Sequence, residues 1–173
     1  TIYGATWVDG KFGKALSFDG VDDYVKIPDS PSLRLGKFTI EMWFKTTELT
    51  TTWNNLIVKE IDSTNRNYVL YIWSGDKILK GSWTSGGVYK EVSTNTNVVD
   101  GKWHHAVLTL DGVKGRIYLD GVLKDEIDSG EADIQEGYDV FIATSRFLSE
   151  WVKGIIDEVR IYNRTLTEEE IKE

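Results

Sequence analysis

Short stretches of alternating apolar and polar residues recur along the whole chain, separated by glycine, aspartate, asparagine and serine. Successive side chains of a strand point to opposite faces, so a period of two indicates half-buried strands, whereas helices repeat every 3.6 residues. About a dozen strands at such close spacing are typical of an all-β sandwich and not of βαβ units. The clearest predicted strands are residues 15–18, 24–27, 38–45, 56–60, 68–73, 77–83, 103–110, 115–119 and 155–162.

Two turns and one helix are also predicted. Asp111-Gly112 and Asp120-Gly121 suit tight turns, because aspartate followed by glycine tolerates the positive φ that such turns require. The second turn makes a hairpin of residues 115–119 and 122–124. Residues 167–171 are the only helical signal, since Thr167 and Glu170 have the spacing of a capping box.

Composition limits what the chain can be and what it can bind. A length of 173 residues with 40% hydrophobic content is enough for one domain with a substantial core. The 28 acidic against 20 basic residues give a formal charge of −8, which argues against nucleic acid and anionic membranes as partners. There is no cysteine, which excludes disulfides and thiol chemistry. No apolar run approaches the roughly 20 residues needed for membrane insertion.

Four segments carry a family resemblance that spans nearly the whole chain: Ser17 to Val25, Gly101 to Val107, Gly115 to Leu123 and Gly154 to Arg164. Together they resemble the laminin-G-like jelly-roll group of concanavalin A-like domains. The resemblance implies a two-sheet antiparallel sandwich over residues 1–164, followed by a short helix or the start of a linker at residues 165–173. It is specific for fold and not for activity, because this group includes lectin-like modules, adhesion domains and enzyme appendages.

A structural calcium ion is the cofactor that we expect. Since the resemblance places the first and last strands side by side, Asp19 and Asp157 are the predicted ligands, and Asp22 or Asp23 could add another. Calcium takes six to eight oxygen ligands and accepts both carboxylates and backbone carbonyls. Many concanavalin A-like sandwiches hold such an ion through an aspartate on the last strand, and Asp157 matches that position. The alternative is that the acidic side chains cap their own turns and that Asp157 pairs with a nearby arginine.

The aromatic residues divide into two groups. Three are expected to pack inside the protein: Trp7, Trp43 and Trp103. Five others border polar or glycine-rich turns and are candidate ligand platforms: Trp53, Trp73, Trp83, Tyr89 and Trp151. Aromatic faces stack on the apolar faces of sugar rings, so the second group favours a carbohydrate ligand.

One motif suggests an enzyme instead. Glu126, Asp128 and Glu131 form the pattern Glu-x-Asp-x-x-Glu, which resembles the catalytic signature of retaining glucanases that share this fold. In that mechanism Glu126 would be the nucleophile, Glu131 the acid/base and Asp128 their partner. The serine and glycine inside the motif and the additional acids around it are typical of a solvated strand end.

The sequence therefore predicts a non-catalytic, calcium-stabilised recognition module of a larger secreted or cell-surface protein. A carbohydrate or surface glycoconjugate is the expected partner. Protein adhesion, the glycoside hydrolase and a purely structural spacer are the alternatives. The extracellular location is an expectation that rests on the resemblance and on the calcium site.

Overall fold

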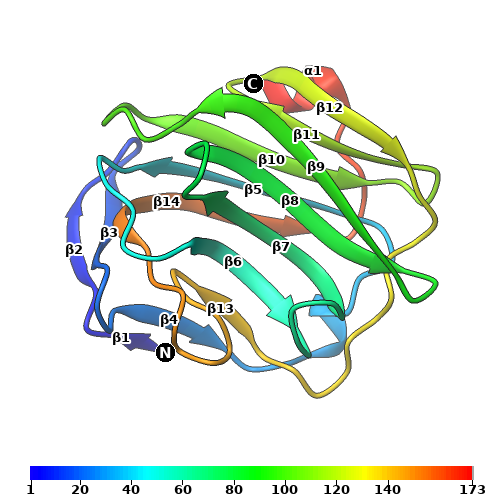
Figure 1. Cartoon of the computed structure of the whole chain (residues 1–173), viewed down its shortest axis with the longest axis horizontal. Coiled ribbons are helices and arrows are strands. Elements are labelled where there is room, and N and C mark those ends of the chain that lie inside the picture. The colour runs from blue at the N-terminus through cyan, green and yellow to red at the C-terminus, as the bar shows by residue number, and fades with distance from the viewer. Residues whose placement is uncertain (173) are drawn as a thin grey trace.

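Two antiparallel β-sheets packed face to face make up the computed structural model, which describes residues 1–172 (Figure 1). The seven strands of sheet A are, in spatial order, β1 (Ile2–Tyr3), β4 (Tyr24–Ile27), β13 (Val140–Ile142), β6 (Trp53–Glu60), β7 (Arg66–Trp73), β8 (Ile78–Ser85) and β9 (Val88–Asn97). Those of sheet B are β12 (Val122–Asp128), β11 (Lys114–Leu119), β10 (His104–Leu110), β5 (Phe38–Lys45), β14 (Lys153–Tyr162), β3 (Lys14–Asp19) and β2 (Thr6–Asp9). Short helices lie at η1 (Pro31–Leu33) and α1 (Glu168–Lys172). The predicted jelly-roll sandwich is confirmed.

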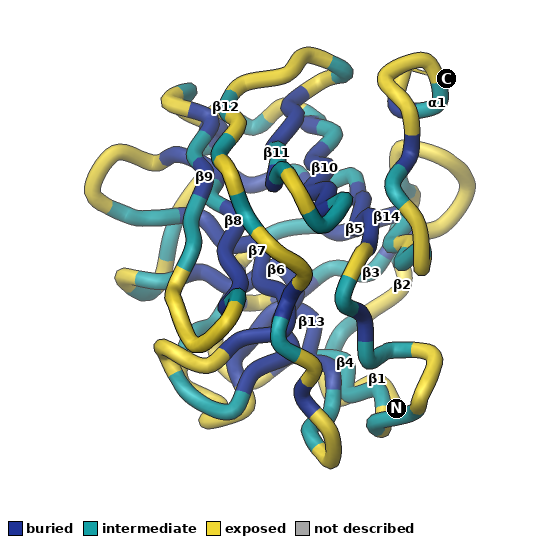
Figure 2. The backbone as a smooth tube through the Cα atoms, turned by 90° about the vertical axis from the view of Figure 1, so that its right-hand side faces the viewer, coloured by how far each residue is buried: buried dark blue, intermediate teal, exposed yellow. Residues whose placement is uncertain are grey.

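Strand β5 shows how the alternation of the sequence builds the core. Phe38, Ile40, Met42 and Phe44 are all buried and belong to the cluster between the sheets. The side chains between them, which include Glu41, point to the outer face of sheet B. One face of each strand therefore fills the core, while the other is free to form a binding surface. Figure 2 shows the buried segments between the sheets and the exposed segments in the loops.

The predicted turns and helix cap are confirmed. Asp120 and Gly121 have φ values of 53° and 76°, as the tight turn between β11 and β12 requires. Thr167 Oγ1 accepts the Glu170 N–H at 3.3 Å, and the Glu170 carboxylate accepts the Thr167 N–H at 2.8 Å. This reciprocal pair is the capping box. The helix packs through Ile171 on the outer face of sheet B.

Strand β14 lies in the middle of sheet B, between β5 and β3. It carries a β-bulge between Asp157 and Arg160, and Glu158 within the bulge has a φ of 50°. Bulges of this kind redirect neighbouring side chains.

Among the described residues, no helix is long and apolar enough to cross a membrane.

Candidate functional site

The outer face of sheet A has a groove of about 600 Å³ that runs across β6, β7, β8 and β9. Pairing of neighbouring strands builds it: Trp53 is paired with Trp73, Tyr71 with Lys80, and Thr84 with Tyr89. We call this the sheet A groove. The side chains used below are Trp53, Arg66, Tyr71, Trp73, Lys80, Tyr89, Glu91 and Glu150.

Aromatic rings form one end of the sheet A groove. The ring centroids of Trp53 and Trp73 lie 4.5 Å apart with an interplanar angle of 64°, and that of Tyr71 lies 5.3 Å from Trp53. Tyr71 is fully buried, whereas the two tryptophans are half-buried. The edge-to-face contact holds each indole in place while part of its surface stays open to solvent.

Glu91 organises the polar part of the groove. Its carboxylate accepts hydrogen bonds from the hydroxyls of Tyr71 and Tyr89, the latter at 2.6 Å, and from Lys80 Nζ at 2.7 Å. Burial alone would raise the pKa of Glu91, but these three donors outweigh it and the pKa lies below its usual value. A rigid, ionised acceptor thus stands beside the aromatic rings.

Arg66 and Glu150 provide further polar groups. Arg66 Nη1 donates to Ser82 Oγ at 2.8 Å, and its guanidinium lies 5.4 Å from the ring centroid of Tyr89. Arg66 Nε is buried and has no hydrogen-bond partner in the described part of the protein. On the opposite side, Glu150 accepts a hydrogen bond from Asn55 Nδ2 at 2.6 Å.

Glu60 lies behind Arg66, at the end of β6, and is only 4% exposed. Its Oε2 atom is 3.5 Å from Arg66 Nε. Burial raises the pKa of Glu60 to about 7, although the positive charge of Arg66 acts in the opposite direction. The charge next to the groove therefore changes near neutral pH.

The structure brings together three of the five predicted platform residues. Trp53, Trp73 and Tyr89 line the sheet A groove. Trp83 was predicted wrongly, because it is 0% exposed and packs in the core between the sheets. Trp151 lies beside the groove without lining it, with its ring centroid 6.1 Å from that of Tyr24.

Sequence reasoning missed five of the groove residues named above: Arg66, Tyr71, Lys80, Glu91 and Glu150. A signal existed for Tyr71, which is two positions before Trp73 on one strand and so shares its face. Arg66 begins the same strand, seven positions before Trp73, while Lys80 and Glu91 come from the neighbouring strands β8 and β9 and Glu150 from the segment before β14. Only the folded arrangement of these elements could have placed them together.

The assignment of three tryptophans to the interior needs correction too. Trp7 on the edge strand β2 is 64% exposed. Trp43 is half-buried on the outer face of sheet B, where its ring stacks on His105. Trp103 is half-buried and precedes β10.

Both glutamates of the glucanase-like motif are engaged in ion pairs on sheet B, Glu131 with Lys37 at 3.3 Å. Glu126 forms ion pairs with Arg116 and Lys114, and Lys114 also binds Asp128 at 2.8 Å. Strand β12 ends at Asp128, and Glu131 is exposed beyond it. Neither glutamate lines the sheet A groove. These carboxylates neutralise lysine and arginine on the edge of sheet B.

The predicted metal ligands Asp19 and Asp157 are not brought together. Strands β3 and β14 are indeed neighbours, but Lys153 is the partner of Asp19, and the register places Asp157 opposite Ala15. Four strand positions, or about 13 Å, separate the two aspartates. Asp157 is buried and accepts the Phe12 N–H at 3.0 Å.

Asp19 lies instead with Asp22 and Asp23, and their carboxylate oxygens are within 4.8 Å of one another. Asp19 Oδ1 accepts the Val21 N–H at 2.8 Å, as in an aspartate-capped turn. Burial raises the pKa of Asp23 first of all, and the negative charges of Asp19 and Asp22 add to this, while the Asp19 N–H lowers it. Three acids that repel one another are a donor set that fits a divalent cation.

Comparison with known families agrees with this architecture. The Laminin_G_3 family model, described as the concanavalin A-like lectin/glucanases superfamily, matches residues 19–172. The chain belongs to this superfamily. The resemblance found in the sequence is thereby confirmed. The comparison with curated protein sequences gives no match.

Solved structures of concanavalin A-like type share the fold at low identity. The binding domain of Paraclostridial Mosquitocidal Protein 1 matches 99% of this chain and 45% of its own, at 16% identity and a TM-score of 0.80. Domain 4 of AbnA, a GH43 extracellular arabinanase from Geobacillus stearothermophilus, was solved with arabinotriose. It matches 98% of this chain and 80% of its own, at 22% identity and a TM-score of 0.74. A putative carbohydrate binding protein from Bacteroides ovatus matches 91% of this chain and 45% of its own, at 17% identity and a TM-score of 0.73. This chain thus spans less than half of the first and third of these relatives, which are described as a binding domain and a putative carbohydrate binding protein, while the second is a domain of an arabinanase.

Proposed function

We propose that this concanavalin A-like domain is a non-catalytic carbohydrate-binding module and that the sheet A groove is its binding site. The observation that carries the proposal is the convergence of Trp53 and Trp73 with the fixed carboxylate of Glu91. Ligand sites combine an apolar lining with a few precisely placed polar groups, and this groove has both.

The two parts of the groove suit the two surfaces of a sugar ring. The apolar face of the ring would stack on the open indole surface, while its hydroxyls would donate to Glu91 and accept from Lys80 and Arg66. The Arg66 guanidinium is kept in place for this role by its hydrogen bond to Ser82 and its ion pair with Glu60. Because Glu91 is already held by Tyr71 and Tyr89, little conformational freedom is lost on binding.

The comparisons support a sugar ligand without identifying it. One structural relative was solved with arabinotriose and another is described as a putative carbohydrate binding protein. The arabinanase that contains the first is described as extracellular. We accordingly propose that this domain works outside the cell, as part of a larger polypeptide that it brings to a polysaccharide.

Replacing Trp73 with alanine should weaken sugar binding at least about 30-fold, which corresponds to about 2 kcal/mol for a tryptophan at the centre of a site. Isothermal titration with arabinotriose and with a panel of neutral trisaccharides measures the effect. Trp7→Ala is the matched control, because this exposed tryptophan lies on the other sheet. Equal losses in both variants, or no loss in either, would exclude the sheet A groove as the site.

The same titrations separate the module from its alternatives. A catalytic domain would release reducing ends from the sugars that it binds, and a non-catalytic module leaves them intact. An adhesion module would bind no member of the panel but would retain a protein partner. A structural spacer would bind neither.

We also propose that calcium stabilises the domain, through Asp19, Asp22 and Asp23. Their mutual repulsion and the raised pKa of Asp23 support this assignment. The ion would neutralise the three acids at the end of β3, which is a structural and not a catalytic role.

Calcium at about 10 mM is expected to raise the free energy of unfolding by about 1–3 kcal/mol relative to excess chelator, if the affinity resembles that of other extracellular modules. Thermal unfolding of the wild type and of Asp22→Ala with and without calcium measures this. The response should disappear in Asp22→Ala and persist in Asp157→Asn, since Asp157 lies about 13 Å away along the strand. A response that depends on Asp157 instead would contradict our assignment of the ligands.

A further inference from the structure

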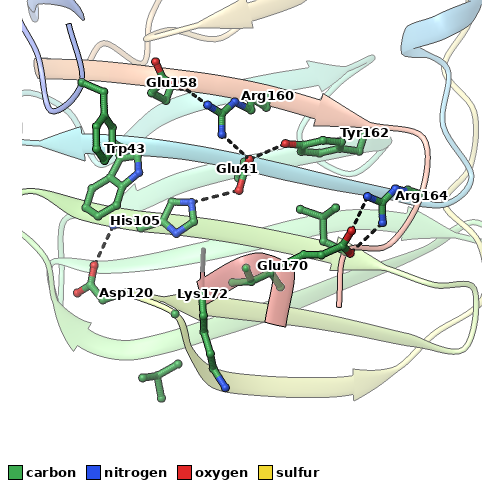
Figure 3. Close-up of a pocket in the computed structure, with 15 residues that line it drawn as sticks. Glu41, Trp43, His105, Asp120, Glu158, Arg160, Tyr162, Arg164, Glu170 and Lys172 are labelled. Atoms are coloured by element: carbon green, nitrogen blue, oxygen red, sulfur yellow. Dashed lines mark hydrogen bonds and ion pairs between the residues drawn. The ribbon is translucent and has the colours of Figure 1, made fainter. Parts of the chain in front are cut away.

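A second hollow, of about 890 Å³, lies on the outer face of sheet B, the opposite side of the sandwich from the sheet A groove. Side chains from β5, β10 and β14 form its floor, while α1 and the turn at residues 10–13 form two of its walls (Figure 3). We call it the sheet B hollow. None of its lining residues lines the sheet A groove.

Glu41 is the polar centre of the sheet B hollow and is only 6% exposed. Its carboxylate accepts a hydrogen bond from the Tyr162 hydroxyl at 2.8 Å and lies 3.2 Å from His105 Nε2 and 3.3 Å from Arg160 Nη1 (Figure 3). Burial by itself would raise the pKa of Glu41, but hydrogen bonds from His105, Tyr162 and Arg160 hold it below its usual value. The carboxylate is therefore ionised and fixed by partners on the two strands that flank β5, namely His105 on β10 and Arg160 and Tyr162 on β14.

Aromatic rings flank this polar centre. The Trp43 ring stacks on His105 with a centroid distance of 5.0 Å and an interplanar angle of 16°, and Phe12 contacts Trp43 edge-on at 5.9 Å. Phe12 is more than half exposed. The buried Asp157 carboxylate holds the Phe12 N–H and thereby fixes this wall. That contact gives Asp157 a role in the hollow that the sequence did not suggest.

The bulge in β14 shapes the same place. Glu158 adopts a left-handed backbone conformation that non-glycine residues rarely take, and backbone strain of this kind is concentrated at functional sites. Arg160, just after Glu158, is paired with Glu41 on β5. The bulge thus brings a guanidinium to the buried carboxylate at the centre of the hollow.

Both arginines of the sheet B hollow are paired with carboxylates of the hollow. Arg160 binds Glu158 as well as Glu41, and Arg164 binds Glu170 through two hydrogen bonds of 2.7 and 2.9 Å. Such pairs offer donors and acceptors side by side with little net charge. A neutral ligand with many hydroxyls fits this surface better than an ion does.

An extended peptide fits it less well. Strands β5, β10 and β14 are each paired on both sides, so that the floor has no free strand edge for a peptide to join. The hollow offers side-chain groups and aromatic surface only, and its volume is within the usual range of small-ligand sites.

We propose that the sheet B hollow is a second carbohydrate site, which binds a neutral sugar unit through Glu41, Tyr162, Arg160 and the aromatic wall of Trp43 and Phe12. The domain then holds two glycan segments on opposite faces and can cross-link polysaccharide chains as a monomer. This goes beyond the proposed function, because each face binds independently of the other.

Isothermal titration with the neutral trisaccharide panel tests the proposal through stoichiometry. The wild type should bind two molecules of the best sugar, Trp53→Ala/Trp73→Ala should retain one, and Glu41→Gln/Tyr162→Phe should also retain one. Thermal unfolding checks that each variant is folded. Arg116→Met is the matched control, because Arg116 lies on sheet B outside the hollow and its loss should leave two sites.

Each outcome distinguishes the two proposals. A stoichiometry of one that only the tryptophan substitutions abolish would overturn the second site and leave the sheet A groove as the binding site. A stoichiometry of one that only Glu41→Gln/Tyr162→Phe abolishes would uphold the sheet B hollow and overturn the sheet A groove. Two sites that survive in a folded Glu41→Gln/Tyr162→Phe variant, or no binding of any sugar, would contradict the sheet B hollow.

Discussion

Replacing Trp83 with alanine should lower the free energy of unfolding by about 3–5 kcal/mol, the usual cost of removing a buried large aromatic side chain. Trp83 is fully buried between the sheets, and its indole N–H donates to Ser129 Oγ at 2.8 Å. The substitution leaves a cavity in the core and also removes this hydrogen bond. Urea unfolding at constant pH measures the loss, and Trp83→Phe should show a smaller one.

Gly115 provides a sharper test of the same packing. A Cβ atom added there would lie 2.1 Å from the Trp83 ring, so Gly115→Ala should destabilise the domain by about 1–3 kcal/mol through overpacking. In Trp83→Phe/Gly115→Ala the smaller ring makes room for the new methyl group. The combined loss should therefore be less than the sum of the two single losses. Strict additivity, or a Trp83→Ala variant as stable as the wild type, would contradict the proposed packing.

Glu60→Gln should remove a pH dependence of stability that the wild type shows between pH 4.5 and 7. The pKa of Glu60 rises from 4.5 to about 7 on folding, chiefly through burial. Below pH 4.5 the Glu60 carboxyl is protonated in both the folded and the unfolded state, so it does not make the free energy of unfolding depend on pH. As the pH rises through this range the unfolded chain loses the proton while the folded protein keeps it, so stability falls, in total by about 3 kcal/mol.

Urea unfolding at pH 5 and at pH 8 measures the effect. Wild-type stability should be lower at pH 8, whereas Glu60→Gln should show a much smaller difference and be the more stable of the two at pH 8. Glu169→Gln is the control, because Glu169 is exposed on α1 and its substitution should leave the wild-type difference intact. A difference of equal size in Glu60→Gln would mean that another group is responsible.

The fold was predictable because its signals are local. Alternation along residues 38–45 identified the strand, and aspartate-glycine pairs identified the turns. The assignment of Trp43 to the interior was wrong, because the buried face of this strand is that of Phe38, Ile40, Met42 and Phe44. The same alternation could have corrected the error at Trp83. This residue is two and four positions from Gly81 and Leu79, and all three point inward on β8, since Gly81 faces the core residue Leu108. A neighbouring turn is a weaker guide to burial than the phase of the strand.

The two binding surfaces were only partly predictable, because they depend on register. The prediction that the first and last strands are neighbours is confirmed for β3 and β14. The offset of four strand positions between Asp19 and Asp157 could not be predicted, because the sequence does not specify the register of this pair. A register shift between Asn55 and Ile57 likewise changes which side chains of β6 face outward. Glu41 and its partners on β10 and β14 are distant in sequence, so no local pattern links them.

The position of β14 has a consequence for biosynthesis. Because β14 lies between β5 and β3, sheet B is divided into two parts until residues 153–162 have left the ribosome. Until then β5 and β3 each present an open edge, which is prone to pairing with other chains. The domain can complete its folding only after this last strand has been synthesised, and contacts so distant in sequence form slowly. A premature stop before residue 153 would therefore yield an aggregation-prone chain rather than a smaller stable domain.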